Sequence, residues 1–377
     1  MNKKYKILVL SHAFLKKINL SFYEQLGKNK NYRISCVVPI SLINNGKTIY
    51  PDFNQYNGLI KVIKCKLKNS STSRLFYFLN IKKYIISEKP NLIILDNDTV
   101  SLQSLILIFY SFFFKYKISY FCNENNLKNI IKKFSLKKFF KLILIFIINL
   151  FIKFKVNNIF CYTRQIQENY DFLGYKKKTF IIPLGYDEKV FFLSKKKKNK
   201  KKIIISYFGR IIPEKGIHIL IKSLENLKNL HWEFMLDIDQ VENNLYYENI
   251  IKNLKKNFQK GRVKFIKCDH YQIANYMKKS HIVVLPSLHE EQYGRVIQEA
   301  VACGNVVVGS NIGSIPEIIK DKDLLFNPGD FNKLSNILKK LFKKFFFKRK
   351  FKRLHKRIIN ERTISKQVLL FNKYLKI

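Results

Sequence analysis

Acidic residues are few in this 377-residue chain, and their scarcity determines its overall charge. The chain holds 26 aspartates and glutamates against 71 lysines and arginines, so its formal net charge is +45 at pH 7. A charge of this size raises the affinity for anionic surfaces such as phospholipid or nucleic acid. A genome biased towards lysine codons would produce the same composition without any function. The sequence leaves both explanations open.

Cysteine is also scarce, and its spacing excludes two classes of protein. The six cysteines form no Cys-x-x-Cys pair, and no cluster of histidines accompanies them. We therefore expect reduced thiols in a cytosolic chain, not a structural zinc site or a disulfide framework. No group of side chains has the spacing of metal ligands, so neither a metal nor another cofactor is expected.

Long hydrophobic runs are missing as well. The longest, Leu105 to Phe114 and Leu142 to Ile152, are each interrupted by a polar residue, whereas a membrane span needs roughly 20 apolar residues. Near the start of the chain the only apolar core is Ile7 to Leu10, which is too short for a signal peptide. We therefore expect neither a transmembrane helix nor a cleaved leader.

Apolar runs alternate with helical patterns along the chain. Tyr5 to Leu10, Leu92 to Leu95 and Ile203 to Phe208 have the length and composition of buried strands. Strands that alternate with helices predict an α/β fold with doubly wound parallel sheets. The length suits two domains. The lysine block from Lys195 to Lys202 indicates their boundary, because like charges keep a segment solvated and extended.

The stretch from Pro286 to Glu317 concentrates the most chemistry. Glu291 and Glu299 are separated by seven residues, and the helical pattern that contains Glu299 begins at Gly294. A glycine there lets a ligand approach the backbone, and free amides at a helix N-terminus attract phosphate. A carboxylate at Glu299 can accept hydrogen bonds from neighbouring hydroxyls. This combination predicts a ligand with a diphosphate between two polyols, which is a nucleotide sugar.

A second motif follows the predicted strand Ile203 to Phe208. It reads Gly-Arg-Ile-Ile-Pro-Glu-Lys-Gly from Gly209 to Gly216 and precedes a helical pattern. Arg210 and Lys215 offer two cations to a diphosphate from one loop.

The two motifs, taken in order, resemble the signatures of the retaining GT-B glycosyltransferases of family 4. Glu291-x7-Glu299 matches the E-x7-E pattern, and the loop from Gly313 to Glu317 is similar to the family's next loop. The resemblance is specific over roughly Ile203 to Asp330 and diffuse in the N-terminal half. It implies two Rossmann-like domains that face a central cleft, with the donor bound by the second domain. We expect these domains at residues 1–190 and 200–362, and a C-terminal helix at 363–377 that crosses back to the first.

The resemblance also implies roles for individual residues. Arg210 and Lys215 would neutralise the leaving diphosphate, Glu291 would bind the hydroxyls of the donor sugar, and Glu299 would bind the ribose. Arg210, Lys215 and Glu291 are thus the expected catalytic residues. The expected nucleotide-sugar site consists of Arg210, Lys215, Glu291, Gly294, Arg295, Val296 and Glu299.

The acceptor side is less well defined. His12, Asn123 and Glu124 follow predicted strand ends, where ligands bind in doubly wound sheets. For each of them alone, a turn or helix-cap role is the alternative. Relatives often carry a histidine where Asn123 to Asn125 stand, so no catalytic base is assigned. The Asp237-x-Asp239 pair resembles a metal motif of the GT-A fold, but we interpret it as a loop.

The sequence thus predicts a retaining enzyme that moves a hexose-type sugar from a nucleoside-diphosphate sugar to a glycan acceptor. A lipid-linked cell-surface glycan, such as lipopolysaccharide, capsule or O-antigen, is the expected acceptor. The alternative is a non-enzymatic basic module that binds nucleic acid or anionic membrane. No nucleic-acid motif occurs, so nucleic acid is not an expected partner.

A basic and apolar stretch, Leu127 to Phe154, predicts a location. Such a segment suits peripheral attachment of a cytoplasmic enzyme to the inner face of the cytoplasmic membrane. A packed helix with solvated lysines is the alternative.

Overall fold

The computed structural model describes residues 4–44, 47–69, 74–122, 149–194, 202–239, 244–269 and 272–375. The chain divides into two compact units, Met1–Gly185 with Ile364–Ile377, and Tyr186–Thr363. The C-terminal helix therefore belongs to the first unit. Asn123, Glu124 and the part of the predicted membrane segment up to residue 148 lie outside the described residues.

The first unit is built on a seven-stranded sheet with the order β11-β10-β9-β8-β1-β2-β5. All of its neighbouring strands are parallel. The strands are β1 (Tyr5–Leu10), β2 (Tyr32–Pro39), β5 (Lys61–Cys65), β8 (Leu92–Asp96), β9 (Lys117–Cys122), β10 (Val156–Cys161) and β11 (Thr179–Ile181). Two short antiparallel pairs lie beside it, β3 (Leu42–Asn44) with β4 (Lys47–Ile49), and β6 (Leu67–Lys68) with β7 (Tyr77–Phe78).

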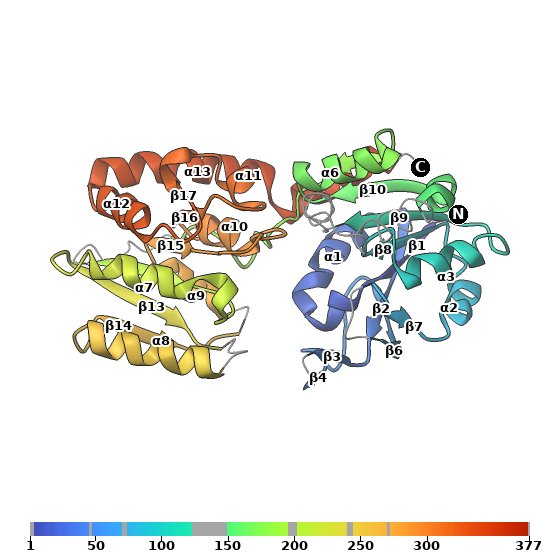
Figure 1. Cartoon of the computed structure of the whole chain (residues 1–377). Coiled ribbons are helices and arrows are strands. Elements are labelled where there is room, and N and C mark those ends of the chain that lie inside the picture. The colour runs from blue at the N-terminus through green and yellow to red at the C-terminus, as the bar shows by residue number, and fades with distance from the viewer. Residues whose placement is uncertain are drawn as a thin grey trace, which may run out of the picture. The chain divides into compact units, whose positions relative to one another are not determined.

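Alternate side chains of β1 enter two different cores. Leu8 and Leu10 pack into one cluster of buried residues, and Ile7 and Val9 pack into the other. Successive side chains of a strand point to opposite faces, so a run that is apolar throughout predicts a sheet covered on both sides. Helices flank the sheet in Figure 1. They are α1 (Ser21–Gly27), α2 (Ile81–Glu88), α3 (Leu102–Tyr110), α6 (Arg164–Tyr170) and α14 (Ile364–Tyr374).

The second unit holds a six-stranded sheet with the order β14-β13-β12-β15-β16-β17, again parallel throughout. Its strands are β12 (Ile203–Tyr207), β13 (Trp232–Asp237), β14 (Val263–Ile266), β15 (Ile282–Leu285), β16 (Val306–Ser310) and β17 (Leu325–Phe326). Its helices are α7 (Ile217–Glu225), α8 (Asn244–Asn257), α9 (Ile273–Lys279), α10 (Arg295–Ala302), α11 (Ile315–Ile319), α12 (Phe331–Leu341) and α13 (Lys344–Glu361) (Figure 1). The predicted α/β fold with two doubly wound parallel sheets is confirmed.

The basic and apolar stretch from Leu338 to Arg357 is divided between two helices. α12 ends at Leu341 and α13 begins at Lys344. Lys343 between them has extended backbone, with ψ of 112°. The break lets both helices reach the same core, into which they bury Leu334, Ile337, Leu338, Leu341, Leu354 and Ile358.

None of the helices in the described part of the chain has the length and apolar character that crossing a bilayer requires.

Candidate functional site

Three loops of the second unit leave the carboxyl ends of neighbouring strands. β15 lies between β12 and β16 in the sheet, so the segments 208–216, 286–294 and 311–314 begin side by side. In an open parallel sheet, ligands bind beyond these strand ends. Both motifs singled out in the sequence lie on these loops.

Lys215 and Glu291 meet between the first two loops. The Nζ atom of Lys215 lies 2.6 Å from Oε1 of Glu291, and both side chains are half-buried. Ser287 donates a hydrogen bond of 2.5 Å from Oγ to the same carboxylate oxygen. A charged hydrogen bond is roughly twice as strong as a neutral one. The pair therefore holds a cation and a carboxylate at one point of the site.

Glycines let the loops approach closely enough for that contact. Gly216 has φ of +66°, and a Cβ atom there would overlap the carbonyl oxygen of Pro286. The amide of Leu288 donates to the carbonyl of Glu214 at 2.8 Å. A Cβ atom on Gly313 would come within 2.6 Å of the backbone oxygen of Glu291. Larger residues at Gly216 or Gly313 would therefore push the loops apart.

Tyr207, at the end of β12, holds the backbone of Arg210. Its buried hydroxyl donates a hydrogen bond of 2.7 Å to the carbonyl of Arg210. Burial raises the pKa of Tyr207 well above its ordinary value, the charge of Glu291 raises it further, and the charge of Arg210 lowers it. Arg210 and Glu291 thus act on the same phenol. The Arg210 side chain is exposed to solvent, where it can reach a bound anion.

The helix α10 begins at the predicted place. Gly294 precedes it with φ of 59°, and Arg295 forms the first turn with Val296, which packs against the core. Glu299 is 2% exposed, and burial raises its pKa to about 7, although the charge of Arg295 lowers it. The expected ribose ligand is therefore a buried carboxyl, not a solvated surface acid.

A buried polar chain supports the same loop from behind. Arg362 donates from Nη1 to the hydroxyl of Tyr293 at 2.9 Å, and Tyr293 donates to Oε1 of Gln298 at 3.1 Å. All three side chains are buried. A buried polar group that lacks a hydrogen bond is costly. These three linked side chains therefore fix the turn that leads from Glu291 into α10.

Several of these supporting residues were missed by the sequence analysis. Ser287 stands inside the motif and Tyr207 lies near the end of a predicted strand, but their roles depend on how the following turns fold back onto them. Glu290 has a buried Oε2 atom with no hydrogen-bond partner among the described residues. Its position beside Glu291 makes it a further possible acceptor for a hydroxyl of a ligand.

In the first unit, the structure places His12 at the end of β1. Its ring centroid lies 4.9 Å from that of Phe76. Burial lowers the pKa of His12, and the nearby charge of Asp96 raises it. Ser11 donates a hydrogen bond of 2.8 Å to Oδ2 of Asp96. A polar cluster thus occupies this strand end, while the other two predicted acceptor residues, Asn123 and Glu124, lie outside the described residues.

The Asp237-x-Asp239 pair has a local structural explanation. Asp237 is 2% exposed, and its Oδ1 atom accepts a hydrogen bond of 3.1 Å from the amide of Asp239. Burial raises the pKa of Asp237 to about 6. Among the described residues, no three His, Cys, Asp or Glu side chains gather as metal ligands would.

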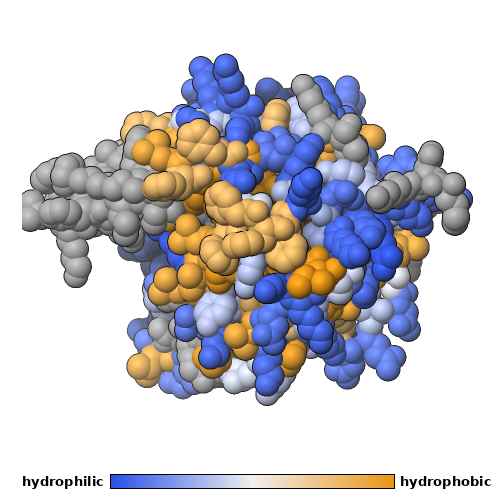
Figure 2. All heavy atoms as spheres, turned by 90° about the vertical axis from the view of Figure 1, so that its right-hand side faces the viewer, coloured by the Kyte–Doolittle hydropathy of each residue, from blue (hydrophilic) through white to orange (hydrophobic). Residues whose placement is uncertain are grey.

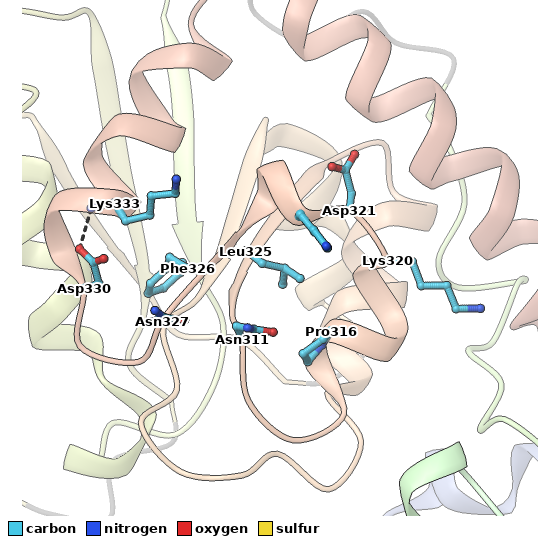
Figure 3. Close-up of a pocket in the computed structure, with 10 residues that line it drawn as sticks. Asn311, Pro316, Lys320, Asp321, Leu325, Phe326, Asn327, Asp330 and Lys333 are labelled. Carbon is cyan, nitrogen blue, oxygen red and sulfur yellow. Dashed lines mark hydrogen bonds between the residues drawn. The ribbon is translucent and has the colours of Figure 1, made fainter.

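A cavity of about 630 Å³ lies near these loops without containing a predicted donor residue. It is lined by Asn311, Pro316, Lys320, Asp321, Lys322, Leu325, Phe326, Asn327, Asp330 and Lys333. Figure 3 shows Asp330 accepting a hydrogen bond from the backbone amide of Lys333, at 2.8 Å, where α12 begins. Asp321 is paired with Lys350 at 2.8 Å. Both aspartates thus have structural partners.

Comparisons with known proteins agree with this geometry. Residues 188–360 match the family model of Glycosyl transferases group 1. An uncharacterized glycosyltransferase of Methanocaldococcus jannaschii, MJ1607, is 28% identical over 141 residues, which are 37% of this chain and 35% of that protein. The serotype-specific mannosyltransferase WbdA of Escherichia coli is 42% identical over 59 residues, 16% of this chain and 7% of that protein. The matched regions thus cover well under half of these relatives.

Solved structures show the fold over nearly the whole chain. The Anabaena protein Alr3699/HepE in complex with UDP superposes with a TM-score of 0.74 at 17% identity, covering 98% of this chain and 99% of that one. Residues 188–360 thus resemble the Glycosyl transferases group 1 family, and the chain has a GT-B fold.

Proposed function

We propose that this chain is a retaining glycosyltransferase of family 4 that transfers a hexose-type sugar from a nucleoside-diphosphate sugar. The observation that carries the proposal is the meeting of Lys215 with Glu291 at 2.6 Å. It brings together a cation for the diphosphate and a carboxylate for the sugar hydroxyls. The neighbour HepE, whose solved complexes contain UDP and UDP-glucose, supports a donor of this class.

In the proposed reaction, the bond between the anomeric carbon and the diphosphate oxygen breaks. The acceptor oxygen bonds to the same face of that carbon, and its proton passes to the leaving diphosphate. Atoms and charge balance without a dedicated protein base or a metal. Arg210 and Lys215 stabilise the negative charge that develops on the diphosphate, which is often the largest catalytic contribution.

The remaining residues hold the donor in place. Glu291 accepts hydrogen bonds from the sugar, and Glu299 accepts them from the ribose. Gly294, Arg295 and Val296 present the start of α10 to the donor. A carboxylate has two oxygens and can accept one hydrogen bond from each of two neighbouring hydroxyls. Glu299 therefore selects a ribose, which carries such a pair of hydroxyls.

We further propose that the acceptor is a lipid-linked cell-surface glycan. The mannosyltransferase WbdA, described as serotype-specific, supports a glycan acceptor. The net charge of +45 supports work at an anionic membrane surface, where each lysine adds about 1 kcal/mol. In this proposal the enzyme is cytoplasmic and attaches peripherally to the inner face of the cytoplasmic membrane.

A screen of nucleotide sugars by thermal shift tests the donor. One nucleoside-diphosphate sugar should raise the melting temperature most and should be hydrolysed slowly by the purified chain. The anomer that is released first, followed by NMR, then tests retention. Absence of both stabilisation and hydrolysis across the common donors would favour the non-enzymatic basic module. Hydrolysis with inversion would reject only the retaining mechanism.

A further inference from the structure

One face of the first unit is apolar although nothing in the described residues covers it. The helix α3 buries Gln103, Ser104, Leu107 and Ile108 against the sheet. Its opposite side, with the turn that follows, exposes Leu105, Phe109, Phe112 and Phe113. Phe112 and Phe113 are each 68% exposed. Exposed aromatic side chains that cluster in this way mark an interaction surface more often than isolated ones do.

A second segment adds to this face. Residues 149–155 are helical and bury Ile152 in the same core as Leu107. They expose Leu150, Phe151 and Phe154, the last at 86%. The Nζ atom of Lys155 lies 4.3 Å from the ring centroid of Phe112, so the two segments adjoin. We call the exposed side chains of Leu105, Phe109, Phe112, Phe113, Leu150, Phe151 and Phe154 the aromatic face.

The charges on the two segments that form the aromatic face have one sign. Lys115 and Lys117 follow α3, and Lys153 and Lys155 lie within the second segment, while residues 102–117 and 149–156 contain no aspartate or glutamate. Figure 2 looks at the side of the first unit on which α3 lies in Figure 1. Hydrophobic side chains gather in the middle of that view and towards its left, with hydrophilic ones above, below and to the right of them.

This arrangement matches one kind of partner. A protein that lies on a membrane places aromatic and leucine side chains at the boundary between headgroups and acyl chains, and lysines against anionic headgroups. A phenylalanine-rich face without acids complements an anionic bilayer in both respects. A second copy of this chain would bring the same lysines together, which like charges disfavour.

We propose that the aromatic face is a docking surface for an anionic phospholipid bilayer. Phe109, Phe112, Phe113, Phe151 and Phe154 enter the headgroup region, and the four lysines contact the phosphates. The inference deepens the proposed membrane attachment and does not depend on sugar transfer. It places the contact on residues 150–154, at the end of the segment Leu127 to Phe154 that the sequence indicated, and on α3, which lies outside that segment.

Co-sedimentation with vesicles tests the surface directly. The wild-type chain should bind vesicles of phosphatidylcholine mixed with phosphatidylglycerol at low salt, and should bind pure phosphatidylcholine much more weakly. The double variant Phe112→Ser/Phe113→Ser and the double variant Phe151→Ser/Phe154→Ser should each lose about tenfold or more in affinity, because apolar insertion is removed. Leu245→Ser is the matched control, since Leu245 on α8 is 76% exposed, and it should bind like the wild type.

Charge variants distinguish the effect of the lysines beside the aromatic face from the effect of the net charge of the whole chain. Lys115→Glu/Lys153→Glu and Lys252→Glu/Lys255→Glu alter the net charge equally, but the second pair lies on α8. Only the first pair should weaken binding strongly. Phe154→Trp adds an exposed reporter to a chain whose sole tryptophan, Trp232, is buried in the second unit. Its emission should shift to the blue with anionic vesicles and be quenched by brominated lipid.

Each contrary result has a distinct meaning. If the wild type binds and the aromatic variants bind equally well, the aromatic face is not the docking surface, although membrane attachment stands. If the wild type stays in the supernatant, the proposed membrane attachment and the proposed docking surface both fail. If the aromatic variants convert a dimer to a monomer without vesicles, the occupant is a second copy and the proposal is overturned. Donor hydrolysis should be unchanged in all these variants, which also confirms that they are folded.

Discussion

Lys215 and Glu291 are 76 positions apart in the chain, yet their side chains form an ion pair of 2.6 Å above the ends of β12 and β15. The pair exists because the two strands are neighbours in a parallel sheet and because Gly216 leaves room for the carbonyl of Pro286. Ser287 completes it with a second hydrogen bond to the same carboxylate oxygen. The ammonium group of Lys215 is thus already held in place before a donor binds.

Replacing Lys215 by alanine should cripple sugar transfer. A charge-assisted phosphate contact contributes about 1.5–3 kcal/mol, which corresponds to roughly 10- to 100-fold in kcat/KM. Arg210→Ala should have a loss of similar size. Steady-state kinetics measure the effect, and Lys252→Ala on the exposed side of α8 serves as the control. Near-normal kcat/KM in both variants would remove these residues from the donor site.

Binding measurements show whether Lys215 contacts the diphosphate or only positions Glu291. If it contacts the diphosphate, Lys215→Ala should weaken the binding of a nucleoside diphosphate and leave that of the nucleoside unchanged. An equal loss for both ligands would instead indicate a disturbed loop.

Gly216→Ala should destabilise the second unit and weaken the donor site together. The left-handed backbone costs an alanine roughly 1–2 kcal/mol, and the overlap with Pro286 adds roughly 1–3 kcal/mol. Gly261 provides a matched control, because its φ is +92° but a Cβ atom there would meet nothing within 4 Å. Gly261→Ala should therefore show the backbone cost alone. Urea denaturation and nucleotide affinity measure the two variants, and equal losses would mean that the loop contact is unimportant.

The sequence predicts the framework of this fold well, because buried parallel strands are continuous apolar runs. Tyr5 to Leu10 is β1, with both predicted ends, and Leu92 to Leu95 forms all but the last residue of β8. The break between α12 and α13 cannot be read from the sequence, since basic and apolar residues continue through Phe342 with helical spacing. α12 ends where it does because both helices pack their apolar side chains against one core.

The candidate site is predicted less completely. Spacing and resemblance indicate Lys215, Glu291 and Glu299, but they do not show that Lys215 and Glu291 pair with each other. The role of Arg362 arises from a contact with Tyr293, 69 positions away in the chain, and that of Tyr207 from the turn that brings the carbonyl of Arg210 to its hydroxyl. Neither residue type nor spacing carries that information.

Sugar transfer should persist when divalent metals are removed. Asp237 is buried and already accepts the amide of Asp239, so the pair is poorly placed to hold a solvated cation on a donor. Transfer assays in EDTA, compared with assays in added Mn²⁺, check this expectation. Complete loss in EDTA that Mn²⁺ restores would return both aspartates to the donor site.

The last prediction concerns Glu299 and folding stability. Burial raises the pKa of this carboxyl from its ordinary 4.5 to about 7. Between these values the folded chain holds one more proton than the unfolded chain, so this contribution to stability falls as pH rises. From about pH 5 to about pH 8 the wild type should lose about 2.5 kcal/mol relative to Glu299→Gln, which cannot ionise. Urea denaturation of both proteins across that range measures the difference, and parallel curves would show that Glu299 titrates normally.

The titration of Glu299 should also change the affinity for the donor. Ribose hydroxyls that donate to Glu299 favour its charged form, which lowers its pKa in the complex. The affinity of the wild type for a nucleoside diphosphate should therefore rise as pH passes about 7, relative to Glu299→Gln. The variant is the proper control, because the diphosphate itself titrates alike with both proteins. Equal affinities at every pH would make Glu299 a structural residue and would leave the ribose without its proposed ligand.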